Sequence, residues 1–301
     1  MKLELELETS TSNYQLLNFR LSPYTGPVAL TRRDFLRSAT VVTAGALTGV
    51  AAYGVAYERH RIDRIVRDIA VRGLPPALDG LRIGMITDVH HSQVVSAEDV
   101  SRAVTVLKEA APDIIVLGGD YVSFFDRAYA GPVAELLAPL ANAPFGSFAV
   151  LGNHDDEREV PAALSARGFT VLKDQRTTLT VRGEPLDIAG IRFWTRSPGE
   201  VAAVLKGTSG TTILLAHDPR RLVEAAALDV QLVLSGHTHG GQVIVPAVGA
   251  IAGRKFPVLA GYAMRENTAL FVSRGVGTVY VPVRINCPPD VAVLTLRPAA
   301  V

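Results

Sequence analysis

The chain has 301 residues, of which 48% are apolar, so it can bury one large core or the cores of two ordinary domains. Its formal net charge is only +1, which excludes the broad basic surface by which proteins bind nucleic acid. The single cysteine, Cys287, excludes an internal disulfide framework and a zinc site built from several thiolates, and it is expected to be a small packed or loop residue.

The N-terminal region has the pattern of an export signal. Residues 1 to about 30 carry no pattern that predicts structure, but residues 31–38 read TRRDFLRS and precede an uncharged stretch at 39–57. This order resembles a twin-arginine (Tat) export signal, and the alternative is an amphipathic helix with a chance pair of arginines. The apolar stretch is at the lower length limit for a membrane span. Both cleavage of the signal and retention as a weak membrane anchor therefore stay open.

The main domain is expected to begin near residue 74. Residues 58–73 are charged and are predicted to be a linker, helical or irregular, after an N-terminal extension at 1–57. Two consecutive prolines then block a helix. From residue 81 onward a buried strand, a polar motif and a helix follow one another repeatedly. The expected strands of this part are 81–87, 114–117 and 148–151, and the expected helices are 99–111, 132–140 and 160–167.

The second half of the chain is richer in strands. The expected strands are 170–172, 177–181, 186–191, 212–216, 230–234, 242–245, 270–273, 278–281 and 291–296, with one helix at 220–227. Early βαβ units followed by a β-rich half predict an α/β fold with two packed mixed sheets flanked by helices, a four-layer α-β-β-α sandwich. No clean linker divides the two halves, so residues 74–298 are predicted to form one catalytic domain.

Five strand ends carry polar motifs of similar chemistry. In chain order these are Asp-x-His at 88–90, Gly-Asp at 119–120, Gly-Asn-His-Asp at 152–155, His-Asp-Pro at 217–219 and Gly-His-Thr-His at 236–239. Carboxylate, amide and imidazole groups without thiolates suit divalent Mn, Fe, Zn, Co or Ni. Residues i and i+2 of an extended segment share a face, so Asp88 and His90 can reach one ion. A carboxylate such as Asp120 can bridge two ions. The sequence therefore predicts a two-metal site.

These motifs, over about residues 80–245, resemble those of the calcineurin-like metallophosphoesterase superfamily. The N-terminal signal and the tail motifs at 273–275, 282–284 and 288–290 resemble its Tat-exported bacterial branch. The resemblance implies a metallo-dependent phosphatase-like fold. It also implies a first ion held by Asp88, His90, Asp120 and His239, and a second held by Asp120, Asn153, His217 and His237.

The resemblance also implies a reaction. His154 would act on the phosphoryl oxygens or protonate the leaving group, and Asp155 would orient a neighbouring group. A hydroxide bridging the two metals would hydrolyse a phosphodiester or a pyrophosphate-linked substrate, with lipids and other cell-envelope molecules among the candidates. The expected partners are this substrate and the Tat export machinery, with membrane association through residues 39–57 and no nucleic acid. The expected location is periplasmic or extracytoplasmic.

Two other functions are weighed against this one. A cytoplasmic nucleotide or protein phosphatase would share the motifs, but the export signal argues against it. A non-catalytic metal-binding scaffold would not need the substrate-facing histidine, and His154 is present. Several other polar and aromatic residues are not expected to bind metal or act in catalysis. They are His91 at the pocket rim, His60 in solvent, Asp218 in a turn or helix cap, Arg274 and Arg284 in surface or structural ion pairs, and Phe193 and Trp194 in core packing.

Overall fold

The computed structural model describes residues 31–299, and the chain divides into two compact units at residues 48 and 49. The described part of the first unit, 31–48, contains most of helix α1 (Arg32–Ala56). Its first turn is capped by the side chain of Thr31, which accepts a hydrogen bond from the backbone N–H of Asp34 (3.1 Å). This helix is long and apolar enough to cross a membrane, judged by length and composition alone.

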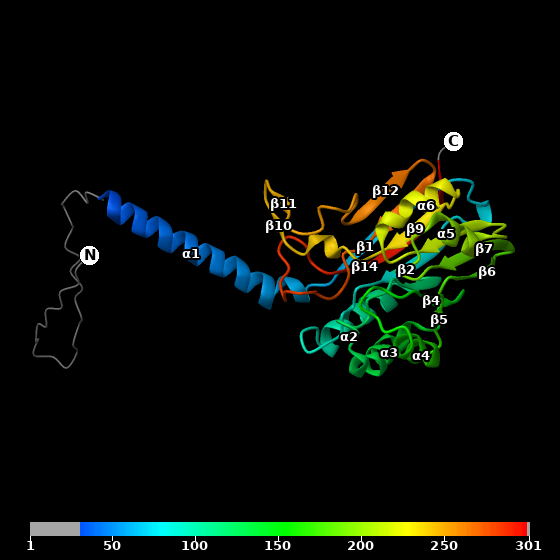
Figure 1. Cartoon of the computed structure of the whole chain (residues 1–301), viewed down its shortest axis with the longest axis horizontal. Helices are drawn as coiled ribbons and strands as arrows, with labels where there is room; N and C mark the ends of the chain where they lie inside the picture. The colour runs from blue at the N-terminus through cyan, green and yellow to red at the C-terminus, as the bar shows by residue number, and fades with distance from the viewer. Residues whose placement is uncertain (1–30, 300–301) are drawn as a thin grey trace, which may run out of the picture. The chain divides into compact units, whose positions relative to one another are not determined.

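The second unit contains two six-stranded sheets (Figure 1). The first sheet has the order β1 (Asp63–Val71), β14 (Asp290–Pro298), β2 (Arg82–Ile86), β3 (Ile114–Leu117), β4 (Ser147–Ala149) and β5 (Thr170–Val171). The second has the order β12 (Gly261–Arg265), β13 (Thr268–Val272), β9 (Leu232–Ser235), β8 (Thr211–Leu215), β7 (Glu184–Gly190) and β6 (Gln175–Val181). Strands β2, β3, β4 and β5 run parallel to one another, as do β7, β8, β9 and β13. The pairs β2–β14, β6–β7 and β12–β13 are antiparallel, so both sheets are mixed. A small hairpin, β10 (Ile244–Val245) and β11 (Gly249–Ala250), lies outside both sheets.

Helices cover the outer face of each sheet. The helices are α2 (Ala97–Glu109), α3 (Ala130–Leu137), α4 (Glu159–Ala166), α5 (Pro198–Leu205) and α6 (Leu222–Ala227). In Figure 1, α2, α3 and α4 lie on the side of the first sheet, and α5 and α6 lie on the side of the second. The sequence analysis missed α5, although its N-terminus carries a complete capping box between Ser197 and Glu200.

Alternating side chains divide the core into layers. In β3, Ile114 and Val116 join the cluster between the two sheets, whereas Ile115 and Leu117 point to α2 and α3. Side chains alternate across a strand, so a strand buried on both faces reads as an unbroken apolar run. The predicted α/β fold, two mixed sheets packed face to face between helices, is therefore confirmed.

Two predicted segments are wrong. Residues 58–73 are not a linker, because they contain β1, which pairs in parallel with β14 along nine residues. In this edge strand Arg64, Arg67 and Asp68 are exposed, whereas Ile69 and Val71 are fully buried. Glu58 is also buried and accepts a hydrogen bond from the backbone N–H of Cys287 (2.6 Å). Residues 278–281, predicted as a strand, form an irregular loop.

Candidate metal centre

The five polar motifs lie in loops at the carboxyl ends of parallel strands. Asp88 and His90 follow β2, and Asp120 follows β3. In the other sheet, His217 follows β8, and the Gly-His-Thr-His motif follows β9. Because the carboxyl ends of parallel strands lie at one edge of a sheet, each sheet presents its loops together. The packing of the two sheets then brings the two sets of loops face to face.

The loops form two groups of potential ligands. Asp88, His90 and His239 form one group, and Asp120, His217 and His237 form the other, with the ligand atoms of each group within 4.8 Å of one another. In the first group, His239 Nε2 lies 3.1 Å from His90 Nε2 and 3.4 Å from Asp88 Oδ1. Nitrogen and carboxylate lone pairs that converge at such distances repel one another unless a cation or a proton lies between them.

One carboxylate oxygen joins the two groups. Oδ2 of Asp120 lies 3.1 Å from Nε2 of His217 and 3.5 Å from Nε2 of His90. The other oxygen, Oδ1, accepts the backbone N–H of His154 (2.8 Å), which fixes the direction of the carboxylate. The side chain of Asp120 is almost fully buried. Its Oδ2 therefore lies between one histidine from each group.

Asn153 offers a further ligand atom. Its Oδ1 is buried and has no hydrogen-bond partner among the described residues. A buried amide oxygen without a partner is costly and is rare in folded proteins. A divalent cation is a suitable partner for this oxygen, so the donor set fits the metals that the sequence predicts.

The backbone of these loops takes an unusual conformation. Asp88, His90, Asp120, His237 and His239 all have φ between 49° and 72°, in the left-handed region that non-glycine residues seldom adopt. Such conformations cost free energy and persist only where the surrounding structure enforces them, most often at functional sites.

Two glycines make room for the carboxylates. A Cβ atom on Gly152 would lie 2.0 Å from Oδ1 of Asp120, and one on Gly236 would lie 2.2 Å from Oδ2 of Asp88. Both distances are far shorter than any real contact, and both contacts are made with buried carboxylates that cannot easily move. The glycines of the 152–155 and 236–239 motifs are therefore needed for space beside the ligands.

Burial and neighbouring charges shift the pKa values of the potential ligands in different directions. Burial raises the pKa of Asp88 to about 6, opposed by His217 and assisted by the charge of Asp120. Burial lowers the pKa of His90 to about 4. Burial alone would also lower the pKa of His217, but the carboxylates of Asp120 and Asp88 outweigh it and raise this pKa to about 10. A cation bound near Asp88 and Asp120 would balance the charge of these carboxylates, as the proton on His217 does when no cation is bound.

A backbone carbonyl fixes the orientation of the His217 ring. Its Nδ1 lies 2.7 Å from the carbonyl oxygen of Gly118, so Nδ1 carries the proton and donates to that carbonyl. The other nitrogen, Nε2, consequently faces Asp88 and Asp120. A backbone carbonyl behind a metal-binding histidine is the usual way to set which nitrogen faces the ion.

Comparison with known proteins places the chain in a family. Residues 81–241 match the calcineurin-like phosphoesterase family, and this stretch contains both groups of potential ligands. The chain belongs to the calcineurin-like phosphoesterase family. It is accordingly a metal-dependent phosphoester hydrolase.

Three relatives show how far the similarity extends. The uncharacterized metallophosphoesterase YkuE of Bacillus subtilis is 32% identical over 89% of this chain and 98% of its own. Phosphodiesterase YaeI of Escherichia coli is 32% identical over 71% of this chain and 82% of its own. A transmembrane protein with a metallophosphoesterase domain from Danio rerio is 30% identical over 83% of this chain and 61% of its own.

His154 lies beside the first group of potential ligands. Its ring packs edge-on against the ring of His90, with centroids 5.0 Å apart. Its Nδ1 accepts the backbone N–H of Phe124 (3.1 Å), so in the neutral ring the proton is on Nε2. The backbone N–H of His154 is held by Asp120. The ring is thus placed next to the centre with a free N–H.

Asp155 lies beneath the loops and contacts backbone only. Its Oδ2 accepts the N–H groups of Asp120 and Gly152, and its Oδ1 accepts that of Tyr121, all at 2.8 Å. Burial and the charge of Asp120 raise the pKa of Asp155 to about 7. The carboxylate joins the loop after β3 to the loop after β4. This contact pattern is that of a positioning residue.

Asp155→Asn is expected to weaken this connection. The NH₂ end of the new amide would face a backbone N–H, and that N–H would lose its acceptor. Each buried polar group left without a partner lowers the free energy of unfolding by about 1–3 kcal/mol. We expect a melting temperature lower by roughly 4–10 °C and a kcat lower by roughly 10–100-fold. Thermal unfolding and steady-state kinetics measure the two effects. Asp156→Asn is the control, since the asparagine oxygen can still accept the backbone N–H groups of Arg158 and Glu159 and only the exposed partner Arg127 loses its ion pair. Unchanged stability and kcat in Asp155→Asn would contradict the role.

The other polar residues have structural roles. His91 points away from the centre, with Nδ1 2.9 Å from the carbonyl oxygen of Val95. Asp218 caps the turn that follows it, as predicted. His60, expected in solvent, instead lies 2.7 Å from Asp99. Arg284, expected at the surface or in an ion pair, is fully buried and donates to backbone carbonyls such as that of Gly277 (2.6 Å).

Arg274, Phe193 and Trp194 differ in how far they match their expected roles. Arg274 forms a structural ion pair with Asp290 (2.8 Å), as expected. Phe193 is buried, but its ring packs 5.1 Å from the ring of His237. Trp194, expected in the core, is 58% exposed.

Sequence reasoning missed several neighbours of the centre. Thr87 donates its hydroxyl to Asp88 (2.8 Å), and Ser123 Oγ lies 3.3 Å from Nδ1 of His90. Phe124 and Tyr280 lie next to His154. Ser123 and Phe124 were detectable in principle, since they follow Asp120 in the same loop. Tyr280 was not, because its segment was predicted as a strand.

Proposed function

We propose that the enzyme binds two divalent cations and hydrolyses a phosphodiester or a pyrophosphate-linked substrate. One ion would be held by Asp88, His90, Asp120 and His239, and the other by Asp120, Asn153, His217 and His237. The observation that carries this proposal is the position of Asp120 Oδ2 between His90 and His217, one from each group. A shared carboxylate oxygen is the usual bridge in two-metal sites.

Two ions bound there would neutralise the phosphoryl oxygens and lower the pKa of a water molecule so that it can attack phosphorus. The nitrogen and oxygen donors suit Mn, Fe, Zn, Co or Ni. The chain itself contributes the positions of the donors. His217 is fixed by Gly118, Asp120 by the backbone of His154, and the loop carrying Asp120 by Asp155.

His154 would stabilise the negative charge that develops on the leaving oxygen. Its Nδ1 accepts the N–H of Phe124 and burial lowers the pKa of the ring, so the neutral ring presents Nε2–H as a hydrogen-bond donor. A donor aimed at developing charge contributes typically ~10²–10³-fold to the rate. The same N–H can also stabilise the charge that develops on a phosphoryl oxygen.

Hydrolysis of bis(p-nitrophenyl) phosphate tests the proposal. The full chain is used, because a chain that started at residue 74 would lack β1 and the Glu58 contact. We expect turnover that depends on added metal, in a panel of the five metals named above. A diester preference is supported by the name of the relative phosphodiesterase YaeI. Metal-loaded protein without turnover on any mono-, di- or pyrophosphate ester would overturn the proposal.

We also propose export by the Tat route, with residues 39–57 as signal or membrane anchor. The paired arginines Arg32 and Arg33 are the first residues of helix α1, before its apolar part, and a relative is named as a transmembrane protein. A reporter fused to residues 1–60 is expected to leave the cytoplasm. The double variant Arg32→Lys, Arg33→Lys, which preserves the charge, is expected to stay inside. Cytoplasmic retention of the unaltered fusion would favour a cytoplasmic phosphatase instead.

A further inference from the structure

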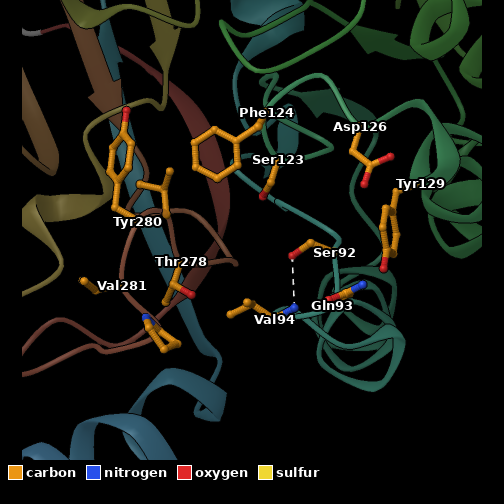
Figure 2. Close-up of a pocket in the computed structure, with 12 residues that line it drawn as sticks. Ser92, Gln93, Val94, Ser123, Phe124, Asp126, Tyr129, Thr278, Tyr280 and Val281 are labelled. Atoms are coloured by element: carbon orange, nitrogen blue, oxygen red, sulfur yellow. Dashed lines mark hydrogen bonds between the residues drawn. The ribbon is translucent and has the colours of Figure 1, made fainter.

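A groove of about 550 Å³ opens beside His154. It is formed by three loops, at residues 92–94, 123–129 and 278–282 (Figure 2). In the figure, the rings of Phe124 and Tyr280 lie near each other at one end, and Asp126 and Tyr129 lie at the other. The ring centroids of Phe124 and Tyr280 lie 5.0 and 6.3 Å from that of His154. Two aromatic side chains of the groove therefore lie next to His154, the residue proposed to act on the leaving group.

The lining of the groove is apolar and lacks a cation. Phe124, Tyr280 and Val281 are 58%, 80% and 50% exposed, which is unusual for large apolar side chains gathered on one surface. None of the described lining residues is Lys or Arg, and Asp126 is the one charged residue among them. The guanidinium of Arg59 donates to the carbonyl of Val94 (3.3 Å) at one edge, so a leaving group that carried a phosphate would meet the Asp126 carboxylate within the groove. The charge of the groove thus favours an uncharged leaving group.

The backbone holds these aromatic rings in strained positions. Phe124 has φ of 52° and Tyr280 has φ of 62°, which is a genuine outlier for bulky residues. Strain of this kind clusters at ligand-binding segments, where it is maintained by the surrounding structure. Thr278 adds a polar group to the groove, because its buried Oγ1 has no hydrogen-bond partner within the described part of the chain.

One wall of the groove is joined to the end of the apolar helix. Within the catalytic unit, which begins at Gly49, the backbone N–H of Arg284 donates to the carbonyl of Gly54 in the last turns of α1 (3.3 Å). A Cβ atom on Gly54 would lie 2.8 Å from Val283 and 2.9 Å from Ile285. The residues that pack against Gly54 come immediately after Val281 and Pro282, the last two groove residues, in the sequence. The segment that forms this wall is therefore fixed to the chain only a few residues after the apolar stretch 39–48.

We propose that the groove binds the hydrocarbon part of a membrane lipid, so that the apolar alcohol is the leaving group of the hydrolysed phosphoester. This inference rests on the proposed function and narrows its substrate class. Water adds to phosphorus, the P–O bond to the alcohol breaks, and the departing oxygen takes a proton. The products are the apolar alcohol, such as a diacylglycerol, and a phosphate or phosphate monoester.

Two matched substrate series test the side on which the hydrocarbon binds. In the first, aryl methyl phosphates carry a para-methyl, para-butyl or para-octyl group on the phenol that leaves. Para-alkyl groups leave the reactivity of the phenol nearly unchanged, so differences report on binding. We expect kcat/KM to rise by roughly tenfold or more from methyl to octyl. In the second series the chain is on the ester that stays, and we expect little change. A flat first series, or an equal rise in both, would overturn the proposal.

Substitutions locate the effect in the groove. Val281→Ser changes an exposed side chain and is expected to remove most of the chain-length dependence while the para-methyl substrate is turned over as before. Trp194→Ser is the matched control, since Trp194 is as exposed as Phe124 but lies outside the groove. It should keep the dependence. A loss of dependence in Trp194→Ser alone would assign the hydrocarbon to another surface.

Two further measurements separate this inference from the proposed function. Calorimetric binding of para-butylphenol does not require turnover, and we expect it to weaken in Tyr280→Ser. Equal binding of para-butylphenol by the unaltered protein and by Tyr280→Ser would contradict binding of the alkyl chain in the groove. Phosphatidylglycerol vesicles test the lipid source, with release of diacylglycerol expected from the full chain. A chain-length effect without any lipid cleavage would overturn the assignment to membrane lipid, whereas turnover of no phosphoester at all would count against the proposed function.

Discussion

Asp120→Asn is expected to lose metal as well as activity. Oδ2 of Asp120 lies within 3.5 Å of a histidine nitrogen from each ligand group, so one atom serves both proposed ions. An amide has no full negative charge to share between two cations, and one end of it is a donor. We expect kcat/KM to fall by roughly 10³-fold or more, together with a large loss of bound metal.

Elemental analysis of the purified variant measures the metal content, and kinetics on bis(p-nitrophenyl) phosphate measure the rate. Asp218→Asn is the matched control, because Asp218 is also buried and adjoins His217 but pairs with Arg220. It should retain its metal. An Asp120→Asn protein with two ions per chain and normal kinetics would show that Asp120 is not the bridge.

His154→Ala is expected to lose activity but not metal. Its ring lies beside His90, and its Nδ1 is occupied by the N–H of Phe124. The backbone N–H that orients Asp120 survives the substitution. We expect kcat to fall by ~10²–10⁴-fold, the usual scale for an acid–base or charge-stabilising group.

The contrast between the two variants is the sharper test. Metal content should be normal in His154→Ala and low in Asp120→Asn. His91→Ala is the control for removal of a nearby histidine, since His91 points away from the centre and contacts Val95. Its kcat should stay within a few-fold of the unaltered protein. Equal metal content in His154→Ala and Asp120→Asn would reverse the proposed assignment of roles.

The sequence by itself determined the strands that carry the site. The apolar runs that precede Asp88, Asp120 and His217 are buried on both faces, and such runs are readable without knowledge of their neighbours. The motifs also predicted which types of donor follow these strands, because carboxylate, amide and imidazole residues are readable directly from the sequence, and the family resemblance implied how they are shared between two ions. Glycines at 152 and 236 are part of those motifs because the adjacent carboxylates leave no room for a side chain.

Only the tertiary structure decided how these loops meet. The charged residues 63–71 became an edge strand because β14, more than two hundred residues later, supplies its hydrogen bonds. The place of Asp120 Oδ2 between two histidines depends on the packing of two sheets, and the tautomer of His217 depends on a carbonyl from the other sheet. The groove joins loops from residues 92–94, 123–129 and 278–282. Contacts between segments so distant in the chain are set by the packing of the whole core, whereas strand patterns and motifs are local properties of the sequence.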